Sequence, residues 1–484
     1  MNNLDKIFNT ALNKIIPSKE EIKFINGIIL KLKKLLGTRA KRLNINYTKI
    51  EAQGSTGIKQ TQLKGDYDID LFVGLDYDQY KPKYEGLSKN KLKKESKKDF
   101  LELCTNWIIK SLQAKEFINP RLLYAEHPYV TVDFLTNNTK IKIDIVLFFD
   151  LELDYIKARG PITAVDRSPW HGRFVRDKLT IPQKNDVRLL KQFFKAAHCY
   201  GDKSAVGKVG FIGYSAELLI YYLGDLNTLF RRFHELETKP LDYYNRSETE
   251  LMEIIHFQND YLIVIDPIDK NRNVASAISK RAYKYCKHII SKFLEKPSES
   301  YFEQTEIKEA DLTKFKETKI THFFIAEFFN QDKDIHYTIN RDKLYSLADS
   351  IKATGEREYS HNERFGSIQF ELYFDDILNE FDLAFYVEHP EISESFLRQG
   401  PPLIEKFHTK KFKEKNPNYF VKDDYLWVET KREYNYFLSF LRDYIHQNIP
   451  ENFQITNISN IFSVKTKLAK QTLFILDNMV LPFI

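Results

Sequence analysis

Two carboxylates two residues apart, Asp68 and Asp70, are the most informative chemical feature of the chain. They alternate with the apolar Ile69 and Leu71, which is the pattern of a strand with one buried face. Side chains two apart on a strand point to the same side, so the two carboxylates are expected to lie next to each other. Such a pair repels itself unless a cation binds between the oxygens, and Mg²⁺ is the hard cation that carboxylates commonly hold.

A third carboxylate and a glycine turn accompany this pair. Asp144 stands in a second strand-like run, 141–148, and can face the first two if that run pairs with the run at 68–75. Gly54-Ser55 comes before them, and the N–H groups and hydroxyl of such a turn suit a triphosphate. Metal ions at such a site activate an attacking hydroxyl and stabilise a leaving oxygen. Asp-x-Asp alone is commonly a solvated strand face, but the full combination is the signature of the nucleotidyltransferase superfamily that includes polymerase β.

The resemblance extends to one family within that superfamily. Over most of its length the chain resembles the archaeal-type (class I) CCA-adding tRNA nucleotidyltransferases, with five segments in matching order and approximate spacing. The Glu-His-Pro-Tyr-Val, Ala-Val-Asp-Arg and Arg-Asn-Val-Ala runs are far more specific than Asp-x-Asp, and Gly400-Pro401-Pro402 also looks like this family. The five segments are 54–73, 124–130, 163–171, 186–191 with its continuations at 200–201 and 213–219, and 266–275.

This resemblance implies template-independent addition and repair of the CCA end of tRNA from CTP and ATP, with Mg²⁺ as the cofactor. It implies that Asp68, Asp70 and Asp144 are catalytic and hold the metal. It also implies that Glu126 and His127 lie near the tRNA end and that Arg272 faces the incoming base. The implied nucleotide-binding residues are Gly54, Ser55, Lys59, His171, Lys191, Tyr200 and Arg272.

Several of these residues, each considered without the motif, also fit an ordinary structural role instead of nucleotide binding. Lys191 also fits an exposed charge on a helix, Arg272 a surface arginine, and Tyr200 a buried aromatic at a helix end. One position departs from the family pattern. Ile58 and Lys59 stand where an Arg is often found shortly after Gly-Ser, and a Lys offers a point charge in place of the bidentate guanidinium.

The elements that position these residues indicate an α+β multidomain chain. Helices are expected over 5–36, with a capping box at Ser18 and a helix end at Gly37. Later helices are expected at 186–200, 214–223 and 277–295, and strand-like runs at 321–328, 368–374 and 382–388. This pattern suggests an α/β domain, a helical middle and an α+β C-terminal part. With the family resemblance, it implies a polymerase-β-like nucleotidyltransferase head at 1–155, a helical central domain at 156–295, and an α+β C-terminal region at 296–484 that binds tRNA.

The composition is that of an ordinary globular protein, and its net charge is weak evidence about partners. The 484 residues include 73 basic and 67 acidic side chains, a net charge of +6, which permits such a partner without requiring one. The lysine-rich stretch 81–99 and Lys410-Lys411-Phe412-Lys413 are each either a solvated face or a phosphate-binding surface. The three cysteines are too few and too scattered for a disulfide framework or a zinc site.

No apolar run approaches the roughly 18 residues that a membrane span needs, and the first residues lack the pattern of a secretory signal. We therefore expect a cytoplasmic protein without a membrane partner, for which a homodimer stays open. Two other functions stay open beside CCA addition. One is a poly(A) polymerase-like or oligonucleotide-synthesising enzyme of the same superfamily, and the other is a non-catalytic RNA-binding relative.

Overall fold

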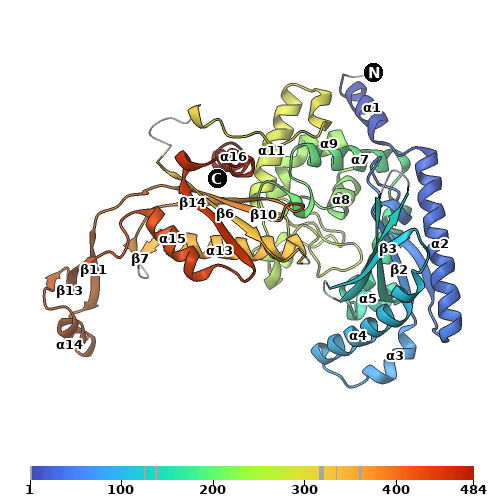
Figure 1. The fold of residues 1–484 in the computed structure, drawn as a ribbon, viewed down its shortest axis with the longest axis horizontal. Helices are drawn as coiled ribbons and strands as arrows, with labels where there is room; N and C mark the ends of the chain where they lie inside the picture. The colour runs from blue at the N-terminus through green and yellow to red at the C-terminus, as the bar shows by residue number, and fades with distance from the viewer. Residues whose placement is uncertain (1–2, 125–126, 137–139, 315–320, 334, 359–361) are drawn as a thin grey trace. The chain divides into compact units, whose positions relative to one another are not determined.

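The computed structural model describes residues 3–124, 127–136, 140–314, 321–333, 335–358 and 362–484 (Figure 1). The chain divides into two compact units. The first consists of 1–201, 211–278 and 286–304, and the second of 202–210, 279–285 and 305–484. The expected α+β multidomain fold is confirmed, because each unit has its own sheet covered by helices. The division into three domains at 155 and 295 stays a prediction.

The first unit is built on a five-stranded mixed sheet with the order β1-β2-β5-β4-β3. The strands β2 and β5 are parallel neighbours, and the other neighbouring pairs are antiparallel. The strands expected at 68–75 and 141–148 are confirmed as β2 and β5. The five strands are β1 (Lys49–Gln53), β2 (Ile69–Leu75), β3 (Phe117–Tyr124), β4 (Pro128–Leu135) and β5 (Lys140–Phe149).

One face of this sheet packs against helices. Leu71 and Val73 of β2 lie in one buried core with Ile145 and Leu147 of β5. The helices that contribute to that core are α2 (Lys19–Leu43), α3 (Tyr77–Tyr84) and α4 (Lys89–Leu103), followed by a π-helical segment at Cys104–Ile109. Since side chains alternate along a strand, the residues between these apolar positions point to the opposite face.

Helix α2 begins as expected and ends later than expected. The capping box is confirmed, because the Ser18 hydroxyl accepts from the backbone N–H of Glu21 and the Glu21 carboxylate accepts from that of Ser18. The predicted end at Gly37 is wrong. A Cβ at Gly37 would lie 3.0 Å from the Tyr47 hydroxyl, so this glycine allows close packing inside the helix. The helix ends at Leu43 and is followed by its capping residue Asn44, which adopts the left-handed conformation with φ 51°.

The rest of the first unit is helical. The helices expected at 186–200 and 214–223 are confirmed as α7 (Ile181–Ala196) and α8 (Gly213–Leu223). The helix expected at 277–295 is confirmed as α11 (Lys280–Glu295), whose first residues belong to the second unit. Phenylalanine rings pack against one another between the helices of this unit, for example Phe193 and Phe230, whose ring centroids lie 4.7 Å apart. The remaining helices are α1 (Asn3–Ile15), α5 (Leu153–Arg159), α6 (Ser168–Lys178), α9 (Leu226–Arg232) and α10 (Glu248–Met252), with short 3-10 turns at 164–167, 233–237, 255–257 and 299–302.

The second unit is built on a four-stranded antiparallel sheet with the order β14-β6-β10-β9. Its strands β6 (Phe323–Asn330), β9 (Ile368–Asp375) and β10 (Glu380–Val387) confirm the three strand-like runs expected there, and β14 (Phe453–Asn460) completes it. The helices α13 (Tyr337–Glu356) and α15 (Phe437–Asn448) share one core with this sheet, and α16 (Lys467–Phe474) shares another. Smaller elements are β7 (Arg357–Glu358), β8 (Asn362–Glu363), β11 (Ser395–Pro402), α14 (Lys406–Lys415), β12 (Phe420–Lys422) and β13 (Tyr425–Lys431).

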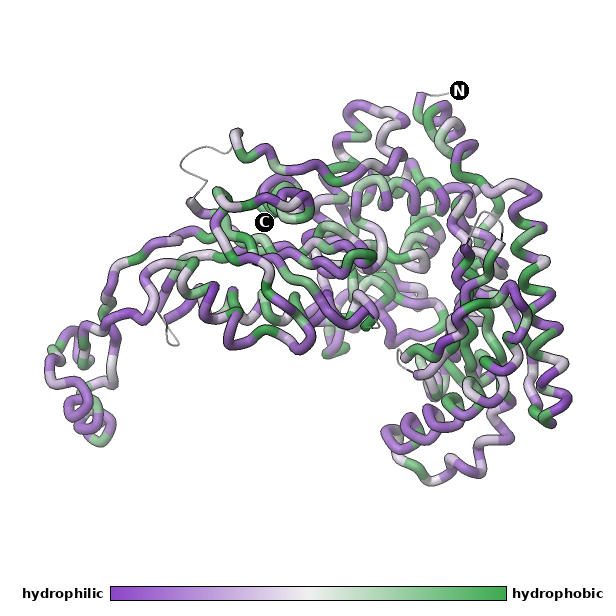
Figure 2. The backbone as a smooth tube through the Cα atoms, viewed as in Figure 1, coloured by the Kyte–Doolittle hydropathy of each residue, from purple (hydrophilic) through white to green (hydrophobic). Residues whose placement is uncertain are grey.

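The hydropathy of the chain differs between helix α4 and the strands of the two sheets (Figure 2). Figure 2 shows α4 as a mostly hydrophilic helix, whereas the strands of the sheets carry apolar stretches. Within the described ranges, no helix combines the length and apolarity that crossing a membrane requires.

Candidate active site

The two parallel strands bring carboxylates from distant parts of the chain together. Asp70 on β2 is paired in register with Asp144 on β5, and both side chains are half-buried on the face opposite the helix-covered core. Asp68 is exposed and lies one residue before β2. The structure therefore brings Asp70 and Asp144 side by side, as their strand positions predict, with Asp68 directly before the start of β2.

The electrostatics of this carboxylate group favour a bound cation. Burial, together with the charges of Asp144 and Asp68, raises the pKa of Asp70 to about 6. Although Asp68 is exposed as a residue, partial desolvation of its carboxyl group, together with the charge of Asp66, raises its pKa. Nζ of Lys142 lies 3.0 Å from Oδ2 of Asp144. The other carboxylate oxygen of Asp144, Oδ1, is buried without a hydrogen-bond partner among the described residues. Carboxylates that repel one another and leave a buried oxygen unpaired fit a hard divalent ion.

Gly54 lets the turn before β2 approach these carboxylates closely. It adopts a left-handed conformation with φ 66°, and a Cβ built on it would lie 2.2 Å from Oδ2 of Asp70. A π-helical turn at Ser55–Lys59 follows, in which the carbonyl of Ser55 accepts from the N–H of Thr61 at 3.0 Å. The Thr56 hydroxyl donates to the carbonyl of Asp68, so the turn is tied to the start of β2.

A cleft of about 660 Å³ opens over this face of the sheet. Its floor includes Asp70 and Asp144, and its walls come from the turn after β1, the segment 164–171 and helix α8. Seven of the twelve residues predicted for the site line this one cleft. They are Gly54, Lys59, Asp70, His127, Asp144, His171 and Arg272.

A buried glutamate, Glu217 on α8, organises one wall of the cleft. Its carboxylate lies 2.7 Å from Nζ of Lys59, accepts from the Thr61 hydroxyl at 2.7 Å and lies 3.4 Å from Nζ of Lys191. Although burial raises the pKa of Glu217, the facing Lys59 and Lys191 hold it below its usual value. Burial lowers the pKa of Lys191 to about 8. Glu217 was not among the predicted site residues, although it stands in one of the family segments.

A buried aspartate, Asp266, organises another part of the cleft wall. Its carboxylate lies 2.8 Å from Nε2 of His171, accepts from Nη1 of Arg272 at 2.8 Å and accepts from the Tyr214 hydroxyl at 3.0 Å. Although burial raises the pKa of Asp266, the facing His171 and Arg272 hold it below its usual range. The rings of His171 and Tyr214 stack at 4.4 Å, and burial lowers the pKa of His171. Asp266 begins the family segment 266–275 but was not among the predicted site residues.

The other predicted residues lie near the cleft or outside the described residues. Lys191 is buried, with Nζ donating to the Thr61 carbonyl and hydroxyl at 3.2 and 3.0 Å, and is not part of the cleft lining. The ring of Tyr200 lies 5.5 Å from Nζ of Lys195. Ser55 begins the π-helical turn, and Glu126 lies outside the described residues. The nucleotide, metal and tRNA contacts of the whole predicted set stay predictions.

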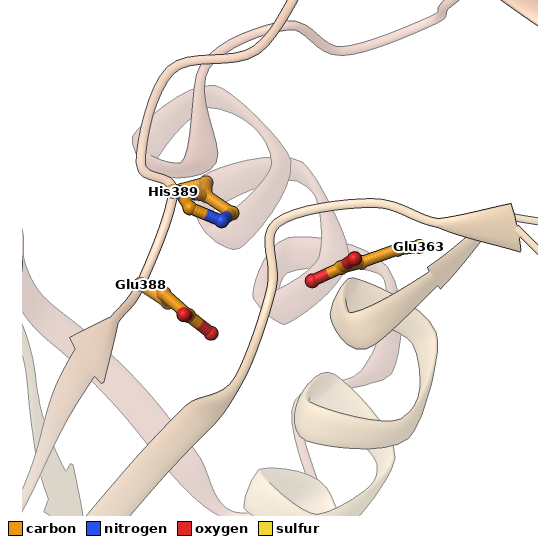
Figure 3. A group of neighbouring side chains, drawn as sticks. All are labelled: Glu363, Glu388 and His389. Atoms are coloured by element: carbon orange, nitrogen blue, oxygen red, sulfur yellow. The ribbon is translucent and has the colours of Figure 1, made fainter.

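A second group of ionisable side chains lies in the second unit. Ligand atoms of Glu363, Glu388 and His389 lie within 4.8 Å of one another, and all three residues are exposed (Figure 3). Glu388 already accepts a hydrogen bond from the N–H of Ser367 at 2.9 Å. Exposed carboxylates of this kind are common without a metal, so we assign no site here.

The contact between Gly54 and Asp70 predicts a large effect of one added methyl group. We expect Gly54→Ala to displace the Asp70 carboxylate and to lower kcat by about a hundredfold, which corresponds to roughly 2.7 kcal/mol. Gly65→Ala is the matched control, since Gly65 also has a positive φ of 76° and an added Cβ there meets nothing within 4 Å. Both variants should lose roughly 1 kcal/mol of stability through backbone strain. Equal activities of the two variants in single-turnover nucleotide addition would show that the contact is unimportant.

The sequence of the chain is similar to those of tRNA nucleotidyltransferases and CCA-adding enzymes. Residues 185–303 match the family model of the second domain of tRNA nucleotidyltransferases, and residues 363–455 match that of the C-terminal domain of CCA-adding enzymes. The chain is 30% identical to a CCA-adding enzyme of Methanococcus maripaludis over 88% of both chains. It is 28% identical to a CCA-adding enzyme of Methanocaldococcus jannaschii over 94% of both chains. A solved cytoplasmic RNA terminal U-transferase aligns over 64% of this chain and 100% of its own, with a TM-score of 0.45 and 18% identity.

Proposed function

Because the chain belongs to the family of CCA-adding enzymes, we propose that it adds the 3′-terminal CCA of tRNA from CTP and ATP, with the cleft of the first unit as its catalytic centre. The enzyme is a nucleotidyltransferase, in which the 3′-hydroxyl of the RNA attacks the α-phosphate of the nucleotide and pyrophosphate leaves. The single observation that carries the assignment of the centre is the register of Asp70 opposite Asp144 on parallel strands.

Divalent ions, which we propose to be Mg²⁺, would be held by Asp70, Asp144 and Asp68. Their carboxylate oxygens and the unpaired buried oxygen of Asp144 support this assignment. When bound there, such ions supply Lewis-acid activation of the attacking hydroxyl and stabilisation of the leaving oxygen. The chain itself supplies the floor that aligns the carboxylates and a turn at Gly54 that can pass close to them.

The two buried carboxylates set the positions of the cationic and aromatic residues that would hold the nucleotide. Glu217 fixes the ammonium group of Lys59 on the cleft wall, where it can bind phosphate oxygens. Asp266 accepts the Nε2–H of a neutral His171, which leaves Nδ1 as an acceptor for a ribose hydroxyl. Asp266 also holds one edge of the Arg272 guanidinium and leaves its other N–H donors for the base.

A cytoplasmic location and a homodimer stay predictions from the sequence. The tRNA contacts predicted for Glu126, His127 and the C-terminal region are part of the same proposal.

Incubation of tRNA lacking its 3′-terminal CCA with one labelled nucleotide at a time tests this function. We expect CTP to be incorporated on this RNA, ATP to be incorporated only on a tRNA that already ends in the two C residues, and no extension by UTP or GTP. A long homopolymeric A or U tail would identify a poly(A) polymerase-like or uridylyl-transferring enzyme. Binding of tRNA without any extension would identify a non-catalytic relative.

A further inference from the structure

We propose that a basic cavity beside the catalytic cleft binds the phosphodiester backbone of the RNA strand whose 3′ end reacts in the cleft. This inference rests on the proposed function and extends it to the path of the RNA. The cavity has a volume of about 610 Å³, and its lining lies within the first unit. His127, Ala164 and Arg167 line both the cavity and the cleft, so the two spaces adjoin.

The lining of the cavity is strongly cationic. Its basic side chains come from four separate parts of the chain: helix α4, the end of helix α5, the 3-10 turn at 164–167, and the segment 266–275. Among the described residues they share one lining carboxylate, Asp269, which already accepts a hydrogen bond from Nη1 of Arg167 at 2.6 Å. The basic residues are Lys93, Lys97, Lys157, Arg159, Arg167 and Lys270.

Five of these cations are left without a counter-charge in the part of the chain that the structure describes. Lys93, Lys97, Lys157, Arg159 and Lys270 are exposed, and none of them forms an ion pair with a described residue. Like charges gathered around one recess repel one another and raise the local positive potential. A polyanion that enters the recess would relieve this repulsion and would be drawn toward it from solution.

The remaining lining favours a phosphate backbone over bases as the bound group. Apart from the His127 imidazole, no aromatic ring lines the cavity among the described residues, so the cavity offers little to stack on. Lysine and arginine contacts to phosphates position a strand without reading its sequence. The arrangement also assigns a role to part of the lysine-rich stretch 81–99, since Lys93 and Lys97 of the hydrophilic helix α4 belong to it.

Neutralising two lysines from different elements tests this proposal on the full-length protein. We compare Lys97→Gln/Lys157→Gln with the control Lys91→Gln/Lys94→Gln, which changes the net charge equally on exposed positions of α4 outside the cavity lining. The dissociation constant of tRNA lacking its CCA end is measured as a function of salt. For the cavity variant we expect a salt slope shallower by about 0.7 per lost phosphate contact and an affinity lower on the order of tenfold at low salt. The control should match the wild type.

Neutral linkages in the RNA locate the contact. Each of the last three phosphates of the RNA is replaced in turn by an uncharged methylphosphonate. At least one replacement should weaken binding to the wild type and have no further effect on the cavity variant.

Equal losses of affinity in both proteins, or equal salt slopes of the cavity variant and the control, would overturn the proposal. So would a raised KM for CTP with unchanged RNA affinity, because the cavity would then hold nucleotide phosphates. These experiments measure RNA binding and therefore test the cavity alone. The proposed function is tested separately, because it would be refuted if the wild type failed to extend tRNA.

Discussion

Asp70→Asn is expected to lower kcat/KM for nucleotide addition by about a thousandfold or more. Asp70 faces Asp144 in register at the floor of the cleft, and an amide cannot replace the negative charge that holds a divalent ion. Loss of metal assistance costs several kcal/mol in the transition state, and about 4 kcal/mol corresponds to roughly a thousandfold in rate. The measurement is single-turnover extension of tRNA lacking its CCA end.

The fold should survive this substitution. Asn has nearly the same shape as Asp, and the raised pKa of Asp70 shows that its charged form is disfavoured by burial and by its acidic neighbours. We therefore expect a melting temperature and a tRNA affinity close to those of the wild type. Asp177→Asn is the control, because Asp177 is an exposed carboxylate on α6 that pairs with Arg176 outside the cleft lining. Undiminished turnover of Asp70→Asn would refute the placement of the catalytic centre.

Arg272→Ala is expected to change which nucleotides are used. Arg272 lines the cleft, and its bond to Asp266 fixes the plane of the guanidinium. Cytosine and adenine present acceptors on their Watson–Crick edges, whereas uracil and guanine each carry an N–H donor there that an always-protonated Arg cannot accept. An unmatched buried donor costs about 1–3 kcal/mol, which corresponds to roughly ten- to a hundredfold in selectivity.

Incorporation of each of the four nucleotides by the wild type and by Arg272→Ala measures this selectivity. The variant should use CTP and ATP less well and should use UTP or GTP relatively more, without a change in the dependence on the divalent ion. Arg176→Ala is a matched control, since it removes an exposed guanidinium of the same unit. An unchanged preference would mean that the bases are recognised by other groups than Arg272.

The parts of the site that follow from local pattern were predictable from the sequence. Alternation of Asp68 and Asp70 with apolar residues predicts both the strand and the shared face of the carboxylates, and the apolar neighbours of Asp144 predict the strand beside it. Gly37 shows where a local signal is ambiguous, because a glycine both ends helices and permits close packing within them. Here the Tyr47 hydroxyl, which lies beside Gly37 only in the folded structure, decides between the two.

The buried carboxylates that organise the cleft walls could not be predicted in the same way. Glu217 is 158 residues from Lys59, and Asp266 is 95 residues from His171, so neither pairing leaves a periodic pattern in the sequence. Only the topology of the first unit brings them together. The departure from the family at Lys59 becomes understandable in this setting, because a flexible lysine can satisfy Glu217 and still line the cleft.

The most direct test of the proposed activity is to sequence the 3′ ends formed from tRNA lacking its CCA end when all four nucleotides and Mg²⁺ are present. We predict that the wild type produces ends that terminate in CCA and extends them no further, and that Asp70→Asn leaves the ends unchanged. Ends that carry homopolymeric tails or mixed sequences, or full CCA addition by Asp70→Asn, would contradict both the function and its placement in the cleft.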